Sequence, residues 1–324
     1  MSVSSSRWQR TGELREQVLR DAPAPPRRKG RWFLSLLVSL LVLFWAFDGA
    51  NFHLRELVKE SPKILQTISR MLPPDFSRVQ QIKSYSLPES LSWAELILPL
   101  PLQSGEGAER AEKIQAKRRW WNNVFPNTII GATIQTIQMA LTGTVLATIF
   151  AFPLAFLAAA NTSPHPLVYR LTRFVINFLR TIPDLALGLI FVAAVGLGPF
   201  AGTLALAMHT MTVLTKLLSE SIENIDPGVV EAIRATGATY LQTVSFAVLP
   251  QMLPDLISFT LYRFETNIRA ASVLGLIGAG GIGHLLSSSF KLFQYQEAAT
   301  IVLILIVLVM LVDSLSARLR RWVI

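Results

Sequence analysis

The stretch IVLILIVLVMLV at residues 301–312 runs for twelve positions without one polar side chain. It shows neither the alternation of a half-exposed strand nor the one-sided spacing of a surface helix, so it must meet lipid or other buried helices. A hydrocarbon core of roughly 30 Å takes about 20 helical residues to cross. The 324-residue chain is 51% hydrophobic and only 16% charged, which is too apolar for an ordinary soluble domain. The sequence therefore predicts an all-α integral membrane protein with about six transmembrane helices.

Six apolar segments are candidates for these crossings. The first covers residues 32–47, with Trp32 and Trp45 near its ends, where amphipathic rings favour the level of the lipid headgroups. No small-residue cleavage site follows it, so we expect a retained crossing and not a signal peptide. Pro153 should kink or end the second segment. The other five segments run over residues 127–160, 171–197, 200–218, 248–277 and 297–315.

Basic residues gather at both ends of the chain. Residues 1–31 hold eight Arg and Lys against three acids, and residues 318–324 contain three Arg. Because cytoplasmic flanks of membrane helices are enriched in Lys and Arg, both ends should be cytoplasmic and the number of crossings even. We therefore expect residues 1–31 to be a cytoplasmic tail, residues 48–119 a polar extracytoplasmic insert, residues 120–317 the core domain and residues 318–324 a basic cytoplasmic end.

Several classes of function find no support in the residues. The net charge of +9 does not indicate a nucleic-acid partner, because the basic residues flank apolar segments and form no soluble basic face. The chain has no cysteine, which excludes disulfides and thiolate metal sites. Its four histidines lack metal-ligand spacing, and neither a GxSxG nucleophile motif nor a Walker A phosphate-binding sequence occurs. We expect no catalytic residue, metal or cofactor in this chain.

The most polar stretch of the second half is residues 219–246. Asp226 can cap a helix whose first residue is Pro227, and Gly237 is the residue type that ends helices in the left-handed conformation. This pattern predicts an exposed helix over residues 227–236. A second helix should follow and reach Leu249 and Pro250, so that a compact helix-turn-helix element stands on the cytoplasmic face between the fourth and fifth crossings.

This element resembles the EAA loop of ABC importer permeases. The resemblance is carried by Glu231-Ala232-Ile233, Gly237, Ala247 and Leu249-Pro250, although the usual pattern has Ala at 233 and Ile at 247. In that family the loop engages the ATPase. The resemblance therefore implies a coupling loop over residues 219–246, with contacts to the ATPase from Asp226, Pro227, Glu231, Ala232, Gly237, Leu249 and Pro250.

A wider resemblance to phosphonate transporter permeases runs from residue 174 to residue 321. Residues 84–125 look like an insertion relative to that family. The resemblance implies the type I ABC importer architecture, and a homodimer in the bacterial inner membrane with a substrate-binding protein outside and cytoplasmic ATPase subunits that hold ATP and magnesium. The implied cargo is a phosphonate or a related phosphorus oxyanion. The matching stretches are MLPPDF at 71–76, NTSPHPLVYR at 161–170, RTIPD at 180–184, GLGPF at 196–200, DPG at 226–228, EAIRATGAT at 231–239, LYRFETNIRAASVLGLIGAGGIG at 261–283 and RLRR at 318–321.

Residues 278–283 match the GxGxxG pattern of dinucleotide-binding proteins. Such a site needs a preceding strand and a later acidic residue, whereas these glycines lie among transmembrane segments. We expect a flexible outer turn that allows close helix packing or contacts the binding protein. The glycines concerned are Gly278, Gly280, Gly281 and Gly283.

The fifth apolar segment is unusually polar, with Arg263, Glu265, Asn267 and Arg269 inside seven residues. Charged groups within a bilayer normally face a protein interior or an aqueous path, so these four are candidates for a translocation path or gate. A structural ion pair between Glu265 and Arg269, four residues apart, is an alternative. Arg263 suits an oxyanion through its planar fork, or could instead cap a helix carbonyl or contact another subunit.

His209 and Lys216 share a helical face of the fourth segment. A lone His is usually a packing residue, and Lys216 can snorkel to the interface, so neither counts as catalytic evidence.

The cargo and the class of transporter remain open on the sequence alone. The cargo could instead be phosphite, phosphate or an amino acid, because the coupling loop does not encode the solute. A secondary transporter driven by an ion gradient would need no ATPase, and would often show two related halves with broken helices.

Overall fold

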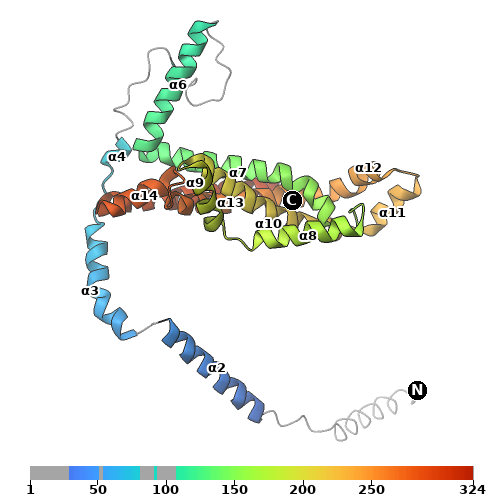
Figure 1. Cartoon of the computed structure of the whole chain (residues 1–324), viewed down its shortest axis with the longest axis horizontal. Helices are drawn as coiled ribbons and strands as arrows, with labels where there is room; N and C mark the ends of the chain where they lie inside the picture. The colour runs from blue at the N-terminus through green and yellow to red at the C-terminus, as the bar shows by residue number, and fades with distance from the viewer. Residues whose placement is uncertain (1–28, 51–53, 81–90, 93–106, 324) are drawn as a thin grey trace, which may run out of the picture. The chain divides into compact units, whose positions relative to one another are not determined.

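The computed structural model describes residues 29–50, 54–80, 91–92 and 107–323, and all regular structure in these ranges is helical (Figure 1). The chain divides into two units after Leu65. The first unit contains α2 (Lys29–Gly49) and most of α3 (Leu54–Arg70). From Ser35 onward α2 is exposed and apolar on every side, as expected of a helix that meets lipid.

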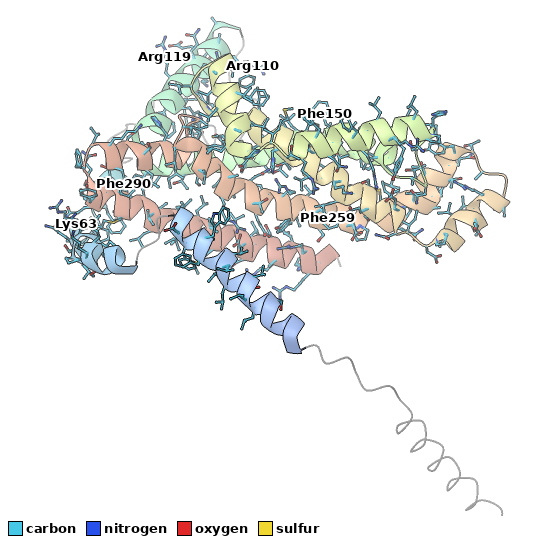
Figure 2. The ribbon with its side chains drawn as sticks, turned by 60° about the horizontal axis from the view of Figure 1, so that its bottom comes forward. Lys63, Arg110, Arg119, Phe150, Phe259 and Phe290 are labelled. Carbon is cyan, nitrogen blue, oxygen red and sulfur yellow. The ribbon has the colours of Figure 1, made fainter. Side chains whose placement is uncertain are left out.

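The region of residues 48–119 contains helices in its described parts. Besides α3, they are α4 (Ser77–Gln80) and α6 (Ala108–Asn127), while parts of the insertion at residues 84–125 lie outside the described residues. Helix α6 carries charged side chains such as Arg110 and Arg119, whereas the following helix α7 (Ile129–Ala158) presents apolar ones such as Phe150 (Figure 2).

The second unit is a bundle of long helices. Four helical stretches in the described residues are long and apolar enough to cross a membrane: Ile129–Ala158, Pro199–Glu223, Tyr240–Gly275 and Tyr295–Trp322. A bent pair can count as a fifth, whereas the apolar part of α2, Ser35–Gly49, is shorter than these spans. After α7 the order is α8 (Pro166–Arg180), α9 (Asp184–Val195), α10 (Pro199–Glu223), α11 (Pro227–Ala235), α12 (Tyr240–Thr243), a π-helical turn (Val244–Val248), α13 (Leu249–Gly275), α14 (Gly281–Lys291) and α15 (Tyr295–Val323).

The third expected crossing is not one straight helix, so that expectation is corrected. It consists of α8 and α9, which meet at an angle of 86° around residues 181–183. Pro183 cannot donate a hydrogen bond and disfavours a helical conformation in the residue before it. Thr181 closes α8 instead, since its hydroxyl donates to the Phe178 carbonyl at 2.7 Å.

Other boundaries also differ from the expectation. Pro153 lies inside α7, which continues to Ala158. The fifth crossing begins at Tyr240 and not at residue 248, because α12, the π-helical turn and α13 form one continuous helical stretch. Helix α14, which the sequence reasoning did not expect, occupies the connection between the fifth and sixth crossings.

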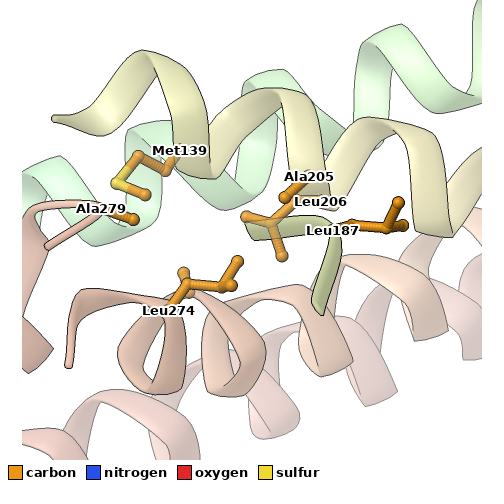
Figure 3. Close-up of a cluster of buried hydrophobic side chains, with 7 residues drawn as sticks. Met139, Leu187, Ala205, Leu206, Leu274 and Ala279 are labelled. Atoms are coloured by element: carbon orange, nitrogen blue, oxygen red, sulfur yellow. The ribbon is translucent and has the colours of Figure 1, made fainter. Parts of the chain in front are cut away.

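The core of the bundle lies where α7, α9, α10 and α13 meet. Met139, Leu187, Leu206 and Leu274 are buried there in one cluster (Figure 3). Small residues let α7 and α10 approach closely: a Cβ at Gly143 would lie 3.0 Å from the Leu206 Cβ. This packing brings the polar residues of α10 and α13 together inside the bundle.

Candidate functional site

The coupling loop has the local structure that its sequence predicts. The Asp226 carboxylate accepts a hydrogen bond from the Gly228 N–H at 2.8 Å, and Pro227 is the first residue of α11. Gly237 has φ +80°, and its N–H donates to the Arg234 carbonyl at 3.0 Å. The predicted helix over residues 227–236 is therefore confirmed, and it ends at Ala235, one residue earlier than predicted.

Helix α11 projects from the end of the bundle (Figure 1), and none of its residues is buried. Glu231 and Ala232 are exposed, and Glu231 makes no hydrogen bond or ion pair with the described residues. An exposed helix without internal partners is available for a partner surface. The second helix reaches Leu249 and Pro250 as expected and continues beyond them, because α12 and the π-helical turn run on into α13.

Hydrogen bonds fix the base of the coupling loop to the bundle. The Asp226 N–H donates to the Gln251 side chain at 3.0 Å, and the Gln251 amide donates to the Ala247 carbonyl at 2.9 Å. The Tyr240 hydroxyl donates to the Thr162 carbonyl at 2.5 Å, across to the turn between α7 and α8. A cavity of about 350 Å³ lies behind α11, lined in part by Glu223, Glu231, Arg234 and Tyr240.

Glu265 and Arg269 of α13 pair with α15 and not with each other. Glu265 is 6% exposed and binds Arg320, with 2.6 Å between Oε1 and Nη2, while Arg269 lies 3.5 Å from Asp313. The alternative of an ion pair between Glu265 and Arg269 is therefore wrong. Because Ile268 packs against α15, the neighbouring acid and base turn toward that helix.

Arg263 lies at one end of a chain of hydrogen bonds across three helices. Its Nη2 donates to the Thr210 hydroxyl at 3.2 Å, which donates to the Asn267 side-chain oxygen at 2.8 Å. The Asn267 amide donates to Thr144 at 2.8 Å, and Thr144 donates to the Ala140 carbonyl at 2.7 Å. Asn267 is 1% exposed and is thus a buried link between α13, α10 and α7.

Sequence reasoning missed that His209 belongs to this cluster. His209 lies within electrostatic range of both Arg263 and Asp184, the first residue of α9. The break before Asp184 places these residues together, and Pro183 was the signal that could have located it. Lys216 lies further along α10 and pairs with Glu220 at 2.8 Å.

The glycines at residues 278–283 serve close packing. Gly278, Gly280 and Gly281 have positive φ angles of 94°, 82° and 70°. A Cβ at Gly283 would lie 1.8 Å from the Ser272 carbonyl oxygen, so α13 and α14 touch through backbone atoms. Gly281 and Gly283 belong to α14, which corrects the expectation that all four glycines form a turn.

Side chains of α7 hold the start of α14. The Gln135 carbonyl oxygen accepts from the Gly281 N–H at 2.7 Å, and the Thr136 hydroxyl accepts from the Ile282 N–H at 2.9 Å. Helix α13, and not a strand, precedes the glycines, which rules out a dinucleotide fold at this position. Among the described residues no group of three or more His, Asp or Glu could hold a metal ion.

Residues 151–324 match the family model described as "Binding-protein-dependent transport system inner membrane component". The putative phosphite transport system permease protein HtxC of Stutzerimonas stutzeri is 37% identical over 307 residues, which are 95% of this chain and 92% of that protein. The phosphite transport system permease protein PtxC of the same organism is 47% identical over 58% of this chain and 68% of its own length. The putative cryptic phosphonate transport system permease protein PhnE2 of Escherichia coli K12 is 53% identical over 36% of this chain and 97% of its own length.

Solved structures confirm the fold. A chain of the MetNI methionine ABC transporter in an inward-facing conformation aligns with a TM-score of 0.54 at 22% identity, over 60% of this chain and 96% of that one. A chain of an amino acid ABC transporter crystallised with histidines aligns with a TM-score of 0.52 at 18% identity, over 60% of this chain and 92% of that one. At these identities the likeness shows the fold, which is that of type I ABC importer permeases.

Proposed function

This chain belongs to the family of binding-protein-dependent transport system inner membrane components, and we propose that it is the permease of an importer for a small phosphorus oxyanion. The observation that carries the proposal is the similarity to a putative phosphite permease over 95% of this chain. Phosphite, phosphonates and phosphate present the same chemistry to a protein, a compact anion with several oxygen acceptors, so the cargo is proposed as this class.

We further propose that α11 docks into a separate ATPase subunit, which would hold ATP and magnesium. The exposed helix and the unpartnered Glu231 carboxylate support this role. The hydrogen bonds of Gln251 and Tyr240 give a physical route for coupling, because a push on α11 would reach α13 and the turn after α7. The complete importer would contain a second copy of the chain and an extracytoplasmic binding protein, with both termini of the permease in the cytoplasm.

Reconstitution of the complete complex in proteoliposomes tests the proposal. The vesicles would contain the permease with its ATPase, and each purified binding protein from the same cell would be added outside. We expect ATP-dependent uptake of phosphite, methylphosphonate or phosphate, but not of methionine. Uptake of methionine alone would overturn the proposed cargo.

The same vesicles distinguish an ATP-driven importer from a secondary transporter. An ABC importer should continue when ionophores collapse the proton and sodium gradients and should stop without internal ATP. Uptake that follows an ion gradient and needs no nucleotide would contradict the coupling proposal. Failure of the permease to co-purify with any ATPase would contradict it as well.

A further inference from the structure

We propose that Arg263 and His209, with Thr210 holding Arg263 in place, form a contact site for a phosphorus oxyanion inside the bundle, beside the break between α8 and α9. The inference rests on the proposed function for the class of cargo and goes beyond it by naming the residues that bind it. We call Arg263, His209 and Thr210 the Arg263 cluster.

Arg263 stands out because it is largely covered and yet makes no ion pair with the described residues. Three other half-buried basic residues of the bundle each lie within 4.0 Å of a carboxylate oxygen: Arg173, Lys216 and Arg320. Arg263 makes one hydrogen bond and no ion pair with the residues that the structure describes, although most of its side chain is covered. A covered charge without a partner is costly, and within a membrane protein it marks a path for an ion or a polar solute.

The guanidinium of Arg263 is held in place by a hydrogen bond and has further N–H groups that could bind a ligand. Its bond to Thr210 uses Nη2, while its Nε is buried and has no hydrogen-bond partner. Thr210 cannot rotate freely, since it donates its own proton to Asn267, which is fixed by Thr144. The guanidinium is therefore oriented before any ligand arrives, and its planar fork matches two oxygens of a phosphorus oxyanion.

His209 supplies a second unused nitrogen on the neighbouring helix. His209 lies within electrostatic range of the Ile182 backbone, which belongs to the break between α8 and α9, and its Nδ1 is buried with no hydrogen-bond partner among the described residues. A buried polar atom without a partner costs free energy, and a ligand oxygen or hydroxyl would satisfy it. His209 interacts electrostatically with Arg263, and Arg263 binds Thr210 on the same helix as His209, so both groups belong to one region of the bundle.

The break between α8 and α9 has one feature that favours the binding of an anion and one that disfavours it. Helix α9 begins at Asp184, so its N-terminal end, which favours anions, lies at the break. The Asp184 carboxylate repels an anion and already accepts the Leu185 N–H at 2.9 Å. Such a balance suits transport, because a site on a path must bind strongly enough to admit the solute and weakly enough to release it.

The unpartnered nitrogens are shielded in the described conformation, while Arg263 and His209 each keep part of their surface exposed. A closed site of this kind belongs to one state of a transporter that opens alternately to the two sides.

The test uses the complete complex in proteoliposomes with phosphite as the probe. Arg263→Gln and His209→Gln are compared with Lys216→Gln, which removes a charge from α10 outside the cluster. Two quantities are measured: phosphite uptake, and the ATP hydrolysis stimulated by the phosphite-loaded binding protein. We expect Arg263→Gln to lower uptake at least about tenfold, because it removes the positive charge and the planar fork of donors, and His209→Gln about fivefold, because it removes the ring nitrogen beside them.

The second quantity separates a cargo contact from a structural role. Stimulated hydrolysis should stay within about twofold of wild type in both variants, because docking and coupling are untouched, and the control should keep both quantities. A parallel loss of assembly, uptake and hydrolysis in both cluster variants would show a structural role and overturn the inference. Uptake at the wild-type rate by an assembled Arg263→Gln complex would overturn it too.

If only Arg263→Gln fails to assemble, Arg263→Lys decides, since it keeps the charge and can keep the bond to Thr210 but loses the planar fork. Reduced uptake with retained hydrolysis supports the site, and wild-type uptake rejects it. The proposed function fails separately, when the wild-type complex transports no phosphorus oxyanion at all.

Discussion

Arg173 on α8 pairs with Glu223 at the end of α10, with 2.7 Å between Nη2 and Oε2. Each partner also binds backbone of the segment after α7. The Arg173 Nε donates to the Ala158 carbonyl at 3.0 Å, and the other Glu223 oxygen accepts from the Ala160 N–H at 2.8 Å. The pair thus clamps the turn between α7 and α8 against the base of the coupling loop.

The clamp predicts that the two partners cannot be exchanged. In Arg173→Glu with Glu223→Arg, the new Glu would face the Ala158 carbonyl and the new Arg the Ala160 N–H, so both backbone bonds are lost. We expect the exchanged protein to be no more stable than the worse single variant. Glu223→Gln keeps an acceptor and should cost only about 1 kcal/mol. Thermal unfolding of the purified complex measures this, and recovery of wild-type stability by the exchange would contradict it.

The pair of Glu265 and Arg320 should contribute to stability more than its neighbour. Glu265→Ala leaves Arg320 without its buried partner, and we expect a loss of about 2 to 3 kcal/mol. Arg269→Gln on the same helix is the matched control, because its pair with Asp313 is half exposed and should contribute less than about 1 kcal/mol. Equal losses in the two variants, measured by unfolding in the same detergent, would refute the assignment.

Gly283→Ala should prevent tight packing of α14 on α13. Its Cβ would lie 1.8 Å from the Ser272 carbonyl oxygen, a backbone atom that cannot move aside without shifting a helix. We expect a loss of at least about 3 kcal/mol or no recoverable complex. Gly49→Ala is the control, because nothing lies within 4 Å of that position. A normal yield and melting temperature for Gly283→Ala would show that this contact is absent.

Variants of the coupling loop should separate assembly from coupling. Glu231 is exposed and makes no hydrogen bond or ion pair with the described residues, so Glu231→Lys should leave the fold intact, and Gly237→Val strains only the loop because that backbone has φ +80°. We expect both permeases to insert while ATPase association or its stimulation by the loaded binding protein falls at least about tenfold. Glu109→Lys, another exposed acid, should change neither. Wild-type transport by both loop variants would remove the coupling role.

The proposed topology can be mapped by labelling single introduced cysteines, because the chain has no cysteine of its own that would react. We expect Glu109→Cys on α6 to react with an impermeant reagent from outside, as expected for the nearby Gly105, which lies outside the described residues. Ser163→Cys and Thr236→Cys should react only after the membrane is opened, because the arginine-rich ends place these turns in the cytoplasm. Labelling of residue 163 in intact cells would contradict the topology with both termini inside.

The sequence by itself determined the features that depend on near neighbours along the chain. Apolar length predicts the crossings, because the hydrocarbon thickness sets how many residues a helix needs. Asp226, Pro227 and Gly237 predict α11 with its two ends, since a cap is made by residues within a few positions of the helix it ends. The bend at Pro183 was in principle visible for the same reason.

Tertiary structure alone decided which polar groups meet. Glu265 has a basic residue four positions away and yet pairs with Arg320, which is 55 positions away, because the packing of α13 on α15 sets the direction in which its side chain points. His209 joins Arg263 for a similar reason, as α10 and α13 pack side by side and the break before Asp184 closes the cluster. Helical periodicity assigns a residue to one face of its helix. Which helix packs against that face depends on the close packing of small residues such as Gly143, and the spacing of residues along a single helix cannot predict that partner.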